Sequence, residues 1–223
     1  MTWSALGRFG VDPAPAGLAF VQDFMDTISA GKPRQEDLLA DRSTAQDWLD
    51  DALRSWAGLA GTARLGIDLA PEDLDQLRSF REDLRRTVTG PQDDAAHAAD
   101  PPPTMLPTLA VGLHWDGAGR VQPLPRGSGW RKVASLVALE VFRAQLDGSW
   151  SRLKACRNPR CAVAFFDRSR NNSAVWHSVK VCGNAANLRA YRARQRATGG
   201  AGGGRGPPAP APRAWPRRGW GGV

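Results

Sequence analysis

The chain has 223 residues, 42% of them hydrophobic, which is enough for one ordinary domain with a sizeable core and a small appended module. This composition argues against a globally disordered chain. No run approaches the roughly 18 consecutive apolar residues of a membrane-spanning helix. Residues 1–17 also lack the basic start and apolar run of a secretory signal. We therefore expect a cytoplasmic protein that does not enter a membrane.

The net charge of +8 is distributed unevenly along the chain. Residues 1–150 hold 15 Lys and Arg against 21 Asp and Glu, a net of −6. Residues 151–223 hold the other 15 cations and a single acid, Asp167, a net of +14. An acidic body joined to a strongly basic segment is expected when that segment binds a polyanion, although a solvated basic tail without a partner would have the same composition.

Residues 16–148 predict one mainly helical domain. Residues 1–15, rich in Pro and Gly, are expected to form a loose lead-in. Apolar residues then recur at helical spacing over three segments, residues 17–30, 43–60 and 71–88. Ser43 is expected to cap the second helix, and Pro71 suits the first turn of the third. Aromatic residues on these stripes are interpreted as core.

A polar, Pro-rich connection at residues 91–104 follows, and then two short strand patterns, LAVGLHW and RVQPLP. They flank Asp116-Gly117-Ala118-Gly119 and predict a β-hairpin, after which residues 129–147 predict another helix. His97 and His114 have no Cys or acid at ligand spacing, so neither is assigned to a site. The Gly-, Pro- and Arg-rich tail at residues 198–223 is expected to be disordered, because it cannot bury enough surface to offset its chain entropy.

All three cysteines lie within residues 156–182, in the spacing C-x4-C, then fifteen residues, then H-x4-C. Two close pairs joined by a connector can wrap a tetrahedral ion, and three thiolates with one imidazole suit Zn²⁺. The predicted zinc ligands are Cys156, Cys161, His177 and Cys182. A disulfide is disfavoured by a reducing compartment and an odd count, while unrelated buried cysteines are the remaining alternative. Four protein ligands leave no open coordination position, so the site is expected to be structural.

A basic helix is predicted from Ala185 to Ala197, where strong helix formers continue without Gly or Pro. Gly183 is expected to adopt a positive φ beside the last thiolate, and Asn184 to cap this helix. Arginines recur along one helix face, where they can meet phosphates or enter a major groove. The predicted nucleic-acid contacts are Arg168, Arg170, Arg189, Arg192, Arg194 and Arg196.

These residues resemble the CGNR zinc finger family, bacterial proteins described as stress-induced transcription regulators. The family pattern is similar to R-L-x-x-C…C-x-x-x-F-x-D-x-S-R-N…W-C-S-x-x-x-C-G-N-R. Its matches here are Arg152, Leu153, Cys156, Cys161, Phe165, Asp167, Ser169, Arg170, Asn171, Trp176, Ser178, Cys182, Gly183 and Asn184. Residues 16–148 also resemble the family's helical N-terminal domain, of the ABATE type, through FMDT at 24–27 and DLL…WL at 37–49.

The chain departs from the family pattern at two positions. His177 stands where the family has its third cysteine, which is chemically tolerable because Cys₃His is a recognised zinc set. Ala185 replaces the arginine that ends the CGNR signature and removes a cation from the start of the basic helix. The expected fold is therefore mainly α: a helical domain with a small hairpin at 16–148, then a treble-clef-like or knuckle-type zinc module at 150–197 ending in the basic helix.

Charge distribution and resemblance together predict a zinc-finger DNA-binding transcription regulator whose N-terminal domain senses a small-molecule effector or a partner. The alternative is a zinc-stabilised protein-interaction or RNA-binding module without sequence-specific DNA binding. No phosphate-binding loop, G-x-S-x-G or H-E-x-x-H motif is present. We therefore expect no enzymatic activity and assign no catalytic residue.

Overall fold

The computed structural model describes residues 2–31, 33–88, 108–158 and 160–184, together with five positions nearer the C-terminus, 187, 188, 191, 192 and 195. The chain divides into two units, residues 1–184 and residues 185–223, which are treated separately below. The predicted connection at 91–104, with His97, and the predicted disordered tail at 198–223 lie outside the described residues.

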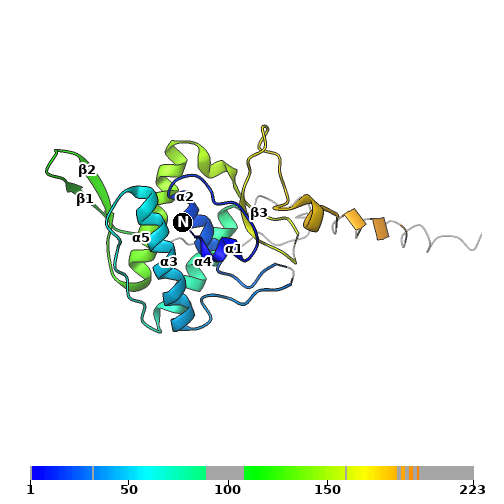
Figure 1. Cartoon of the computed structure of the whole chain (residues 1–223), viewed down its shortest axis with the longest axis horizontal. Coiled ribbons are helices and arrows are strands. Elements are labelled where there is room, and N and C mark those ends of the chain that lie inside the picture. Colours follow the sequence, from blue (N-terminus) through cyan, green and yellow to red (C-terminus); the bar gives the residue numbers. More distant parts are fainter. Residues whose placement is uncertain are drawn as a thin grey trace, which may run out of the picture. The chain divides into compact units, whose positions relative to one another are not determined.

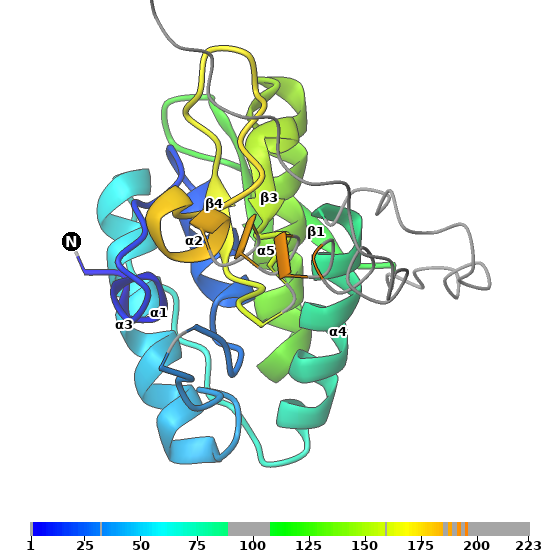
Figure 2. The ribbon, with the colours of Figure 1, turned by 90° about the vertical axis from the view of Figure 1, so that its right-hand side faces the viewer.

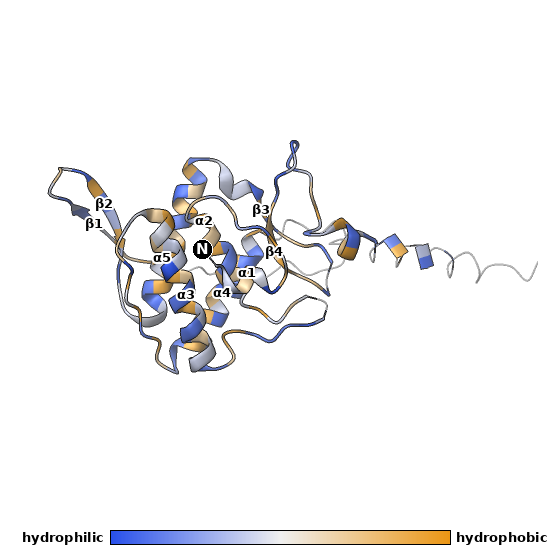
Figure 3. Ribbon diagram, in the orientation of Figure 1, coloured by the Kyte–Doolittle hydropathy of each residue, from blue (hydrophilic) through white to orange (hydrophobic). Residues whose placement is uncertain are grey.

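Helices form most of the regular secondary structure of the first unit (Figure 1), which confirms the mainly α expectation. They are α1 Ser4–Gly7, α2 Leu18–Met25, α3 Arg42–Ala60, α4 Asp73–Val88 and α5 Gly129–Leu146. Helix α2 is central, because all of its residues are buried and it contacts each of the other four helices. Its Phe24 ring lies between Trp48 of α3 and Phe80 of α4, with ring centroids 5.9 and 5.8 Å away. Along α3 hydrophobic and hydrophilic segments alternate (Figure 3), as the periodicity predicts.

The N-terminal segment is ordered where a loose lead-in was expected. Residues 4–7 form a helical turn, and Trp3 and Leu6 are buried in the core. The Leu6 N–H donates to Asp23 Oδ1 at 3.0 Å, and Trp48 Nε1 donates to Asp23 Oδ2 at 2.7 Å. A buried carboxylate on α2 thus fixes this turn, and no local sequence pattern reveals such a contact.

The capping residue of helix α3 lies two residues before the expected one. Asp41 is the capping residue, since its Oδ1 accepts the Thr44 N–H at 3.0 Å and its Oδ2 accepts the Thr44 hydroxyl at 2.6 Å. The prediction of Ser43 as cap was therefore wrong, because an aspartate with the same capping chemistry precedes it. The helix ends at Gly61, whose φ of 62° is the left-handed conformation common at helix C-termini.

The predicted hairpin is present and consists of β1 Val111–Trp115 and β2 Val121–Pro125, paired antiparallel. The Asp116 carboxylate closes its turn by accepting the N–H groups of Ala118 and Arg120, both at 2.9 Å. Figure 1 shows that the hairpin projects from the helices, and the side chains of Leu113 and Trp115 are each 70% exposed.

The cysteine-containing segment adds two very short strands to the first unit. A 3₁₀ turn at Ser149–Arg152 (η2) leads into β3 Leu153–Ala155, which pairs antiparallel with β4 Ala164–Phe166. Strand β4 contacts α2 and β3 contacts α4, so this small sheet lies directly against the helical core (Figure 2). A final helical turn, η3 Val179–Gly183, completes the segment. None of the described helices is long and apolar enough to cross a membrane.

Candidate zinc centre

The first predicted ligand pair lies on the turn that joins β3 to β4. Cys156 follows β3, and its N–H donates to the Val163 carbonyl at 2.9 Å. The N–H groups of Cys161 and Ala162 both donate to the Asn158 carbonyl, at 2.8 and 3.1 Å. Ala162 adopts a left-handed φ of 58°. This tight turn directs both thiols to the same side of the chain.

The second pair lies at η3. The Cys182 N–H donates to the Ser178 carbonyl at 2.8 Å, and Ser178 Oγ accepts the Val181 N–H at 3.3 Å. Ser178 therefore caps this turn, whereas Asn184 is itself helical with φ −61° and ψ −39°, so the prediction of Asn184 as cap was wrong. The turn begins before the last cysteine, which moves the capping position upstream.

Gly183 provides space for its neighbours and does not adopt a left-handed backbone. Its φ is not among the positive values of the described residues, which contradicts the expectation. A Cβ at Gly183 would lie 3.2 Å from a Trp176 ring atom and 3.3 Å from a Val179 methyl carbon. The glycine thus lets the Trp176 indole pack closely beside the last ligand.

The structure brings all four predicted ligands together. The thiols of Cys156, Cys161 and Cys182 are buried, and the four potential ligand atoms lie within 4.8 Å of one another. His177 Nδ1 is 3.3 Å from Cys161 Sγ and 3.7 Å from Cys182 Sγ, so Nδ1 is the nitrogen that faces the cluster. Bond lengths of about 2.3 Å to sulfur and 2.0 Å to nitrogen give a tetrahedron with edges of roughly 3.5–3.8 Å. The donor set therefore fits Zn²⁺ in both chemistry and spacing.

The three cysteine sulfurs lie so close together that they shift one another's pKa. A hydrogen bond from the Cys161 thiol lowers the pKa of Cys156 to about 4, and the same bond raises the pKa of Cys161. Burial raises the pKa of Cys182. One thiolate is thus stabilised while its neighbours keep their protons. A bound dication removes this conflict because it favours the ionised form of all three thiols.

The loop between the two ligand pairs is organised around Asp167. Its carboxylate accepts the Lys154 ammonium at 2.7 Å and the N–H groups of Ser169 and Ala174, both at 2.8 Å. Burial by itself would raise the pKa of Asp167, but Lys154 and the hydrogen bonds outweigh it and hold that pKa well below its usual range. Lys154 also donates to the Asn172 carbonyl at 2.7 Å. This partly buried ion pair shapes the loop that carries His177 back to the first pair.

Buried polar groups of α2 and of the residue that caps its C-terminus, Asp26, attach β4 to the helical core. Asp26 Oδ1 accepts the Ala164 N–H at 2.7 Å, and Gln22 Nε2 donates to the Ala164 carbonyl at 3.4 Å. Asp26 and Gln22 are fully buried. Both backbone groups of a residue in the zinc-binding segment are therefore satisfied by the helical domain.

Helix α4 and the loop after α2 provide further attachments. Arg85 donates to the carbonyls of Ala162 and Met25, the latter at 3.0 Å. It thereby connects α2 to the first knuckle, the turn between β3 and β4 that carries Cys156 and Cys161. The Gly31 N–H donates to the Cys161 carbonyl at 3.4 Å. Buried residues from both sides form one apolar cluster here, namely Ile28, Ala30, Cys156, Cys161, Val163, Phe165 and Cys182. The zinc ligands are thus part of a shared core.

The predicted nucleic-acid contacts differ in their surroundings. Arg168 lies over the Phe166 ring at 5.5 Å and donates to the Pro13 carbonyl at 2.7 Å, so its guanidinium ties the loop to the N-terminal segment. Arg170 is exposed, as is Arg192 within the second unit. The other predicted contacts, Arg189, Arg194 and Arg196, lie outside the described residues.

Three exposed cations were not singled out from the sequence. Arg157 and Arg160 lie on the first knuckle, between its two ligands, and Lys180 lies on the helical turn before Cys182. Their position between paired ligands is the signal that could have identified them, because a turn that directs its ligands inward exposes the residues between them.

The comparison with protein families agrees with this geometry. Residues 152–195 match the family model described as the CGNR zinc finger, which confirms the predicted resemblance over this segment. The likeness of residues 16–148 to an ABATE-type domain stays a prediction. No curated protein matches the chain significantly. The segment is thus a zinc-binding module, and the Cys₃His cluster together with the family match identifies Zn²⁺ as its cofactor.

Proposed function

We propose that this chain, which carries a CGNR zinc finger, is a zinc-dependent regulator that binds nucleic acid through the finger, with duplex DNA as the favoured target. The observation that carries the proposal is the charge of residues 152–184, where seven Lys and Arg stand against one acid. That acid, Asp167, is buried and paired with Lys154, so it does not offset the positive surface. Phosphate backbones are the general partner of such surfaces.

The exposed cations come from both parts of the finger. Arg160 belongs to the first knuckle, Arg170 to the loop and Lys180 to the turn before the last ligand. None of these three side chains makes an ion pair with another described residue, so their charges are available to a partner. Phosphate contacts from such residues would position the finger, and base contacts would have to come from elsewhere, with the predicted basic helix as the candidate.

The metal has a structural role in this proposal. Four protein ligands complete a tetrahedral shell and leave no position for a substrate or an activated water, so we propose no enzymatic role for the site. When bound, Zn²⁺ holds both knuckles together, while Asp167 and Lys154 fix the connecting loop. Zinc binding and nucleic-acid binding are therefore expected to be lost together.

The test is fluorescence anisotropy of labelled random duplex DNA titrated with the full zinc-loaded chain at several salt concentrations. Binding should weaken with salt, with a log–log slope of about −0.9 for each phosphate neutralised. The triple variant Arg160→Ala/Arg170→Ala/Lys180→Ala should weaken binding and flatten this slope. A matched control, Arg54→Ala/Arg64→Ala/Arg120→Ala, removes the same charge from exposed arginines of the helical domain and hairpin and should bind as wild type does.

A flat salt dependence, or equal losses in the two triple variants, would contradict the proposal. Single-stranded RNA measured at the same salt concentration separates DNA from RNA as the preferred ligand. Tighter binding to RNA would keep the finger as a nucleic-acid module and would reject the DNA-binding regulator.

A specific observation favours a second candidate, a protein-interaction module. Val179 and Val181 flank Lys180 and are 67% and 51% exposed, an apolar surface that phosphate binding does not require. Isolated exposed apolar residues are ordinary, but two on one turn suit contact with a protein partner. The double variant Val179→Ser/Val181→Ser should leave DNA binding unchanged if the first proposal holds.

The role of the protein in the cell is also a proposal. Resemblance to stress-induced regulators of bacteria supports a cytoplasmic transcription regulator, in which the helical domain senses a small molecule or partner and the finger contacts DNA. The intimate packing of finger and helical core supports communication between them, since β4 and the first knuckle receive hydrogen bonds from α2 and α4.

A further inference from the structure

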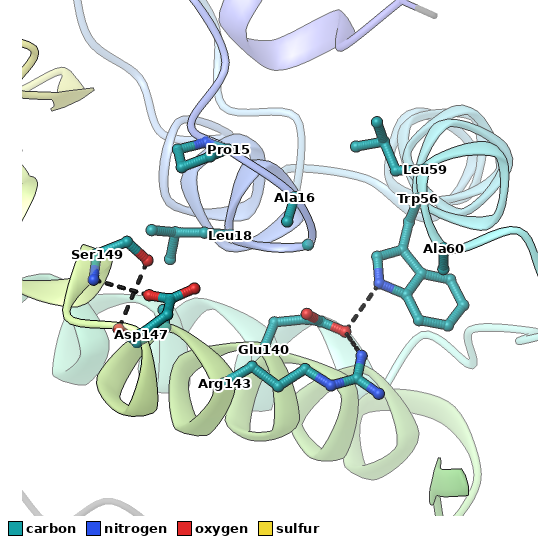
Figure 4. A pocket seen from close by; sticks show the side chains of 12 residues that line it. Pro15, Ala16, Leu18, Trp56, Leu59, Ala60, Glu140, Arg143, Asp147 and Ser149 are labelled. Atoms are coloured by element: carbon teal, nitrogen blue, oxygen red, sulfur yellow. Dashed lines mark hydrogen bonds and ion pairs between the residues drawn. The ribbon is translucent and has the colours of Figure 1, made fainter. Parts of the chain in front are cut away.

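The helical domain contains a pocket on the surface formed by the start of α2, the end of α3 and the end of α5 (Figure 4). Its cavity measures about 250 Å³. Much of the lining is apolar, with Pro15 and Leu18 from the α2 side and Trp56 and Leu59 from α3. At roughly 30 Å³ for each water, this volume equals about eight waters, and a ligand of similar size fits it.

The lining also includes one buried carboxylate, that of Glu140. Glu140 of α5 is 3% exposed, and its Oε1 accepts Trp56 Nε1 at 3.0 Å and an Arg143 N–H at 2.7 Å (Figure 4). Both hydrogen bonds are to Oε1, and within the described part of the chain Oε2 receives none. Oε2 is not among the oxygens that are closed off from solvent without a partner, so it is accessible from the pocket and can accept a hydrogen bond from a ligand donor.

The backbone at the start of α2 leaves space for the same oxygen. A Cβ built on Gly17 would overlap Glu140 Oε2, although the φ of −67° at Gly17 is one that any residue adopts. The absence of a side chain at Gly17 therefore allows the carboxylate to occupy this position, between the start of α2 and the cavity.

The charge of the pocket defines the ligand class. Asp147 also lines it, and hydrogen bonds from Ser149 hold the pKa of Asp147 below its usual value. Glu140, Asp147 and Arg143 together carry a net charge of −1, so a cation is complementary and an anion is not. Among cations, the apolar lining favours one with a hydrocarbon body.

We propose that this pocket binds a small primary amine whose ammonium group donates to Glu140 Oε2 and whose apolar body lies against Trp56 and Leu18. The inference extends the sensor role of the helical domain in the proposed function by naming its site and ligand class. The binding itself does not depend on DNA. Titration of the amine without DNA therefore tests the pocket, and the anisotropy measurement tests the finger.

Isothermal titration calorimetry of the full zinc-loaded chain with hexylamine, hexanol and hexanoate separates charge from hydrocarbon. Hexylamine is protonated at neutral pH, as the Lys side chain is. A charge-assisted hydrogen bond should make it bind roughly ten- to a hundredfold more tightly than hexanol, and hexanoate should bind most weakly. No measurable binding of hexylamine at millimolar concentration, or equal binding of amine and alcohol, would overturn the proposal.

Two variants locate the binding. Glu140→Gln keeps the shape of the side chain and should remove the preference for amine over alcohol. Because this change also leaves Arg143 without its ion pair, a second variant leaves the carboxylate intact. Ala60 is exposed and lines the pocket, so Ala60→Phe should obstruct it and reduce hexylamine affinity at least about tenfold, while Ala60→Ser should bind as wild type does. Unchanged affinity in Ala60→Phe would place the amine elsewhere and reject the site.

Discussion

His177 occupies the position at which the CGNR pattern has a cysteine, and its Nδ1 faces the thiols of Cys161 and Cys182. Replacing it by cysteine should keep the zinc and bind it more tightly, because a thiolate adds negative charge to the site. Cys182→Ser should lose the metal, because it removes a buried thiolate. Metal analysis of the purified variants, with competition by a chromophoric chelator, measures both effects.

His177→Ala is the informative third variant. It leaves three thiolates and opens one coordination position to water. Reduced but measurable zinc affinity is the expected result. Zinc binding identical to that of wild type would show that His177 is not a ligand.

The buried pair of Asp167 and Lys154 gives a second prediction at this scale. Asp167→Asn keeps the size of the side chain but removes the charge, and should lower the free energy of unfolding by about 1–3 kcal/mol. Because the pKa of Asp167 is strongly depressed in the folded protein, its stabilisation is complete above the unfolded value near 3.8 and is lost progressively as pH falls from there through the much lower folded value. Urea unfolding at pH 7 and at about pH 3.5 should thus show only a slightly smaller difference between wild type and variant in acid, because most of the loss occurs at lower pH.

Residue-level features were predictable where chemistry fixes the spacing. The four zinc ligands follow from two pairs of donors, each separated by four residues. The capping residue Asp41 and the role of Gly183 were not predictable in this way, because the first had an equally suitable neighbour and the second depends on the position of Trp176. Asp167 was recognised only as part of the family pattern, and its partner Lys154 becomes visible only when β3 and β4 pair.

Helix α2 is the element on which the other helices pack, and its buried Asp23 makes the stability of the fold sensitive to pH. Burial raises the pKa of Asp23 to about 6, despite hydrogen bonds from Leu6 and Trp48. A carboxyl with a raised folded pKa favours folding below its unfolded pKa near 3.8, and this contribution is lost as pH rises through 6. A shift of about two pH units corresponds to roughly 3 kcal/mol.

Asp23→Asn should remove this dependence. We expect the stability of wild type relative to the variant to fall by about 2 kcal/mol between pH 4 and pH 6.5, because only wild type must ionise a buried carboxyl. Urea titrations of both proteins across this interval provide the measurement. A constant difference would show that Asp23 has the same pKa in the folded and unfolded chains.

Elements were predictable in proportion to their length and periodicity. Helices α3, α4 and α5 carry long amphipathic patterns, and the hairpin has a clear turn sequence between two strand patterns. Helix α1 and strands β3 and β4 are only three or four residues long, and tertiary contacts hold them in place. A carboxylate on α2 stabilises α1, and contacts with α2 and α4 stabilise the two strands.

At the scale of the whole molecule, the metal site and the helical domain share a core within residues 1–184. Removing zinc should therefore destabilise α2 and α4 as well as the knuckles. Chelation is expected to lower the midpoint of helix melting, followed by circular dichroism, by roughly 10 °C. Readdition of zinc should restore it.

Cys182→Ser is the control, since its melting midpoint should already be low and should not respond to the chelator. Identical melting midpoints for wild type with and without zinc would mean that the stability of the helices does not depend on the zinc-binding knuckles. The hydrogen bonds of Asp26, Gln22 and Arg85 to the segment 162–164 make such indifference physically difficult.

The same hydrogen bonds have an evolutionary consequence. Classical zinc fingers fold on metal binding alone, so each contains everything that its folding requires. Here both backbone groups of Ala164 are satisfied by the side chains of Asp26 and Gln22, so a gene fragment that encodes only the knuckles would lack part of the compact unit to which they belong. Genes that acquire this finger by recombination should therefore acquire the helical segment together with it.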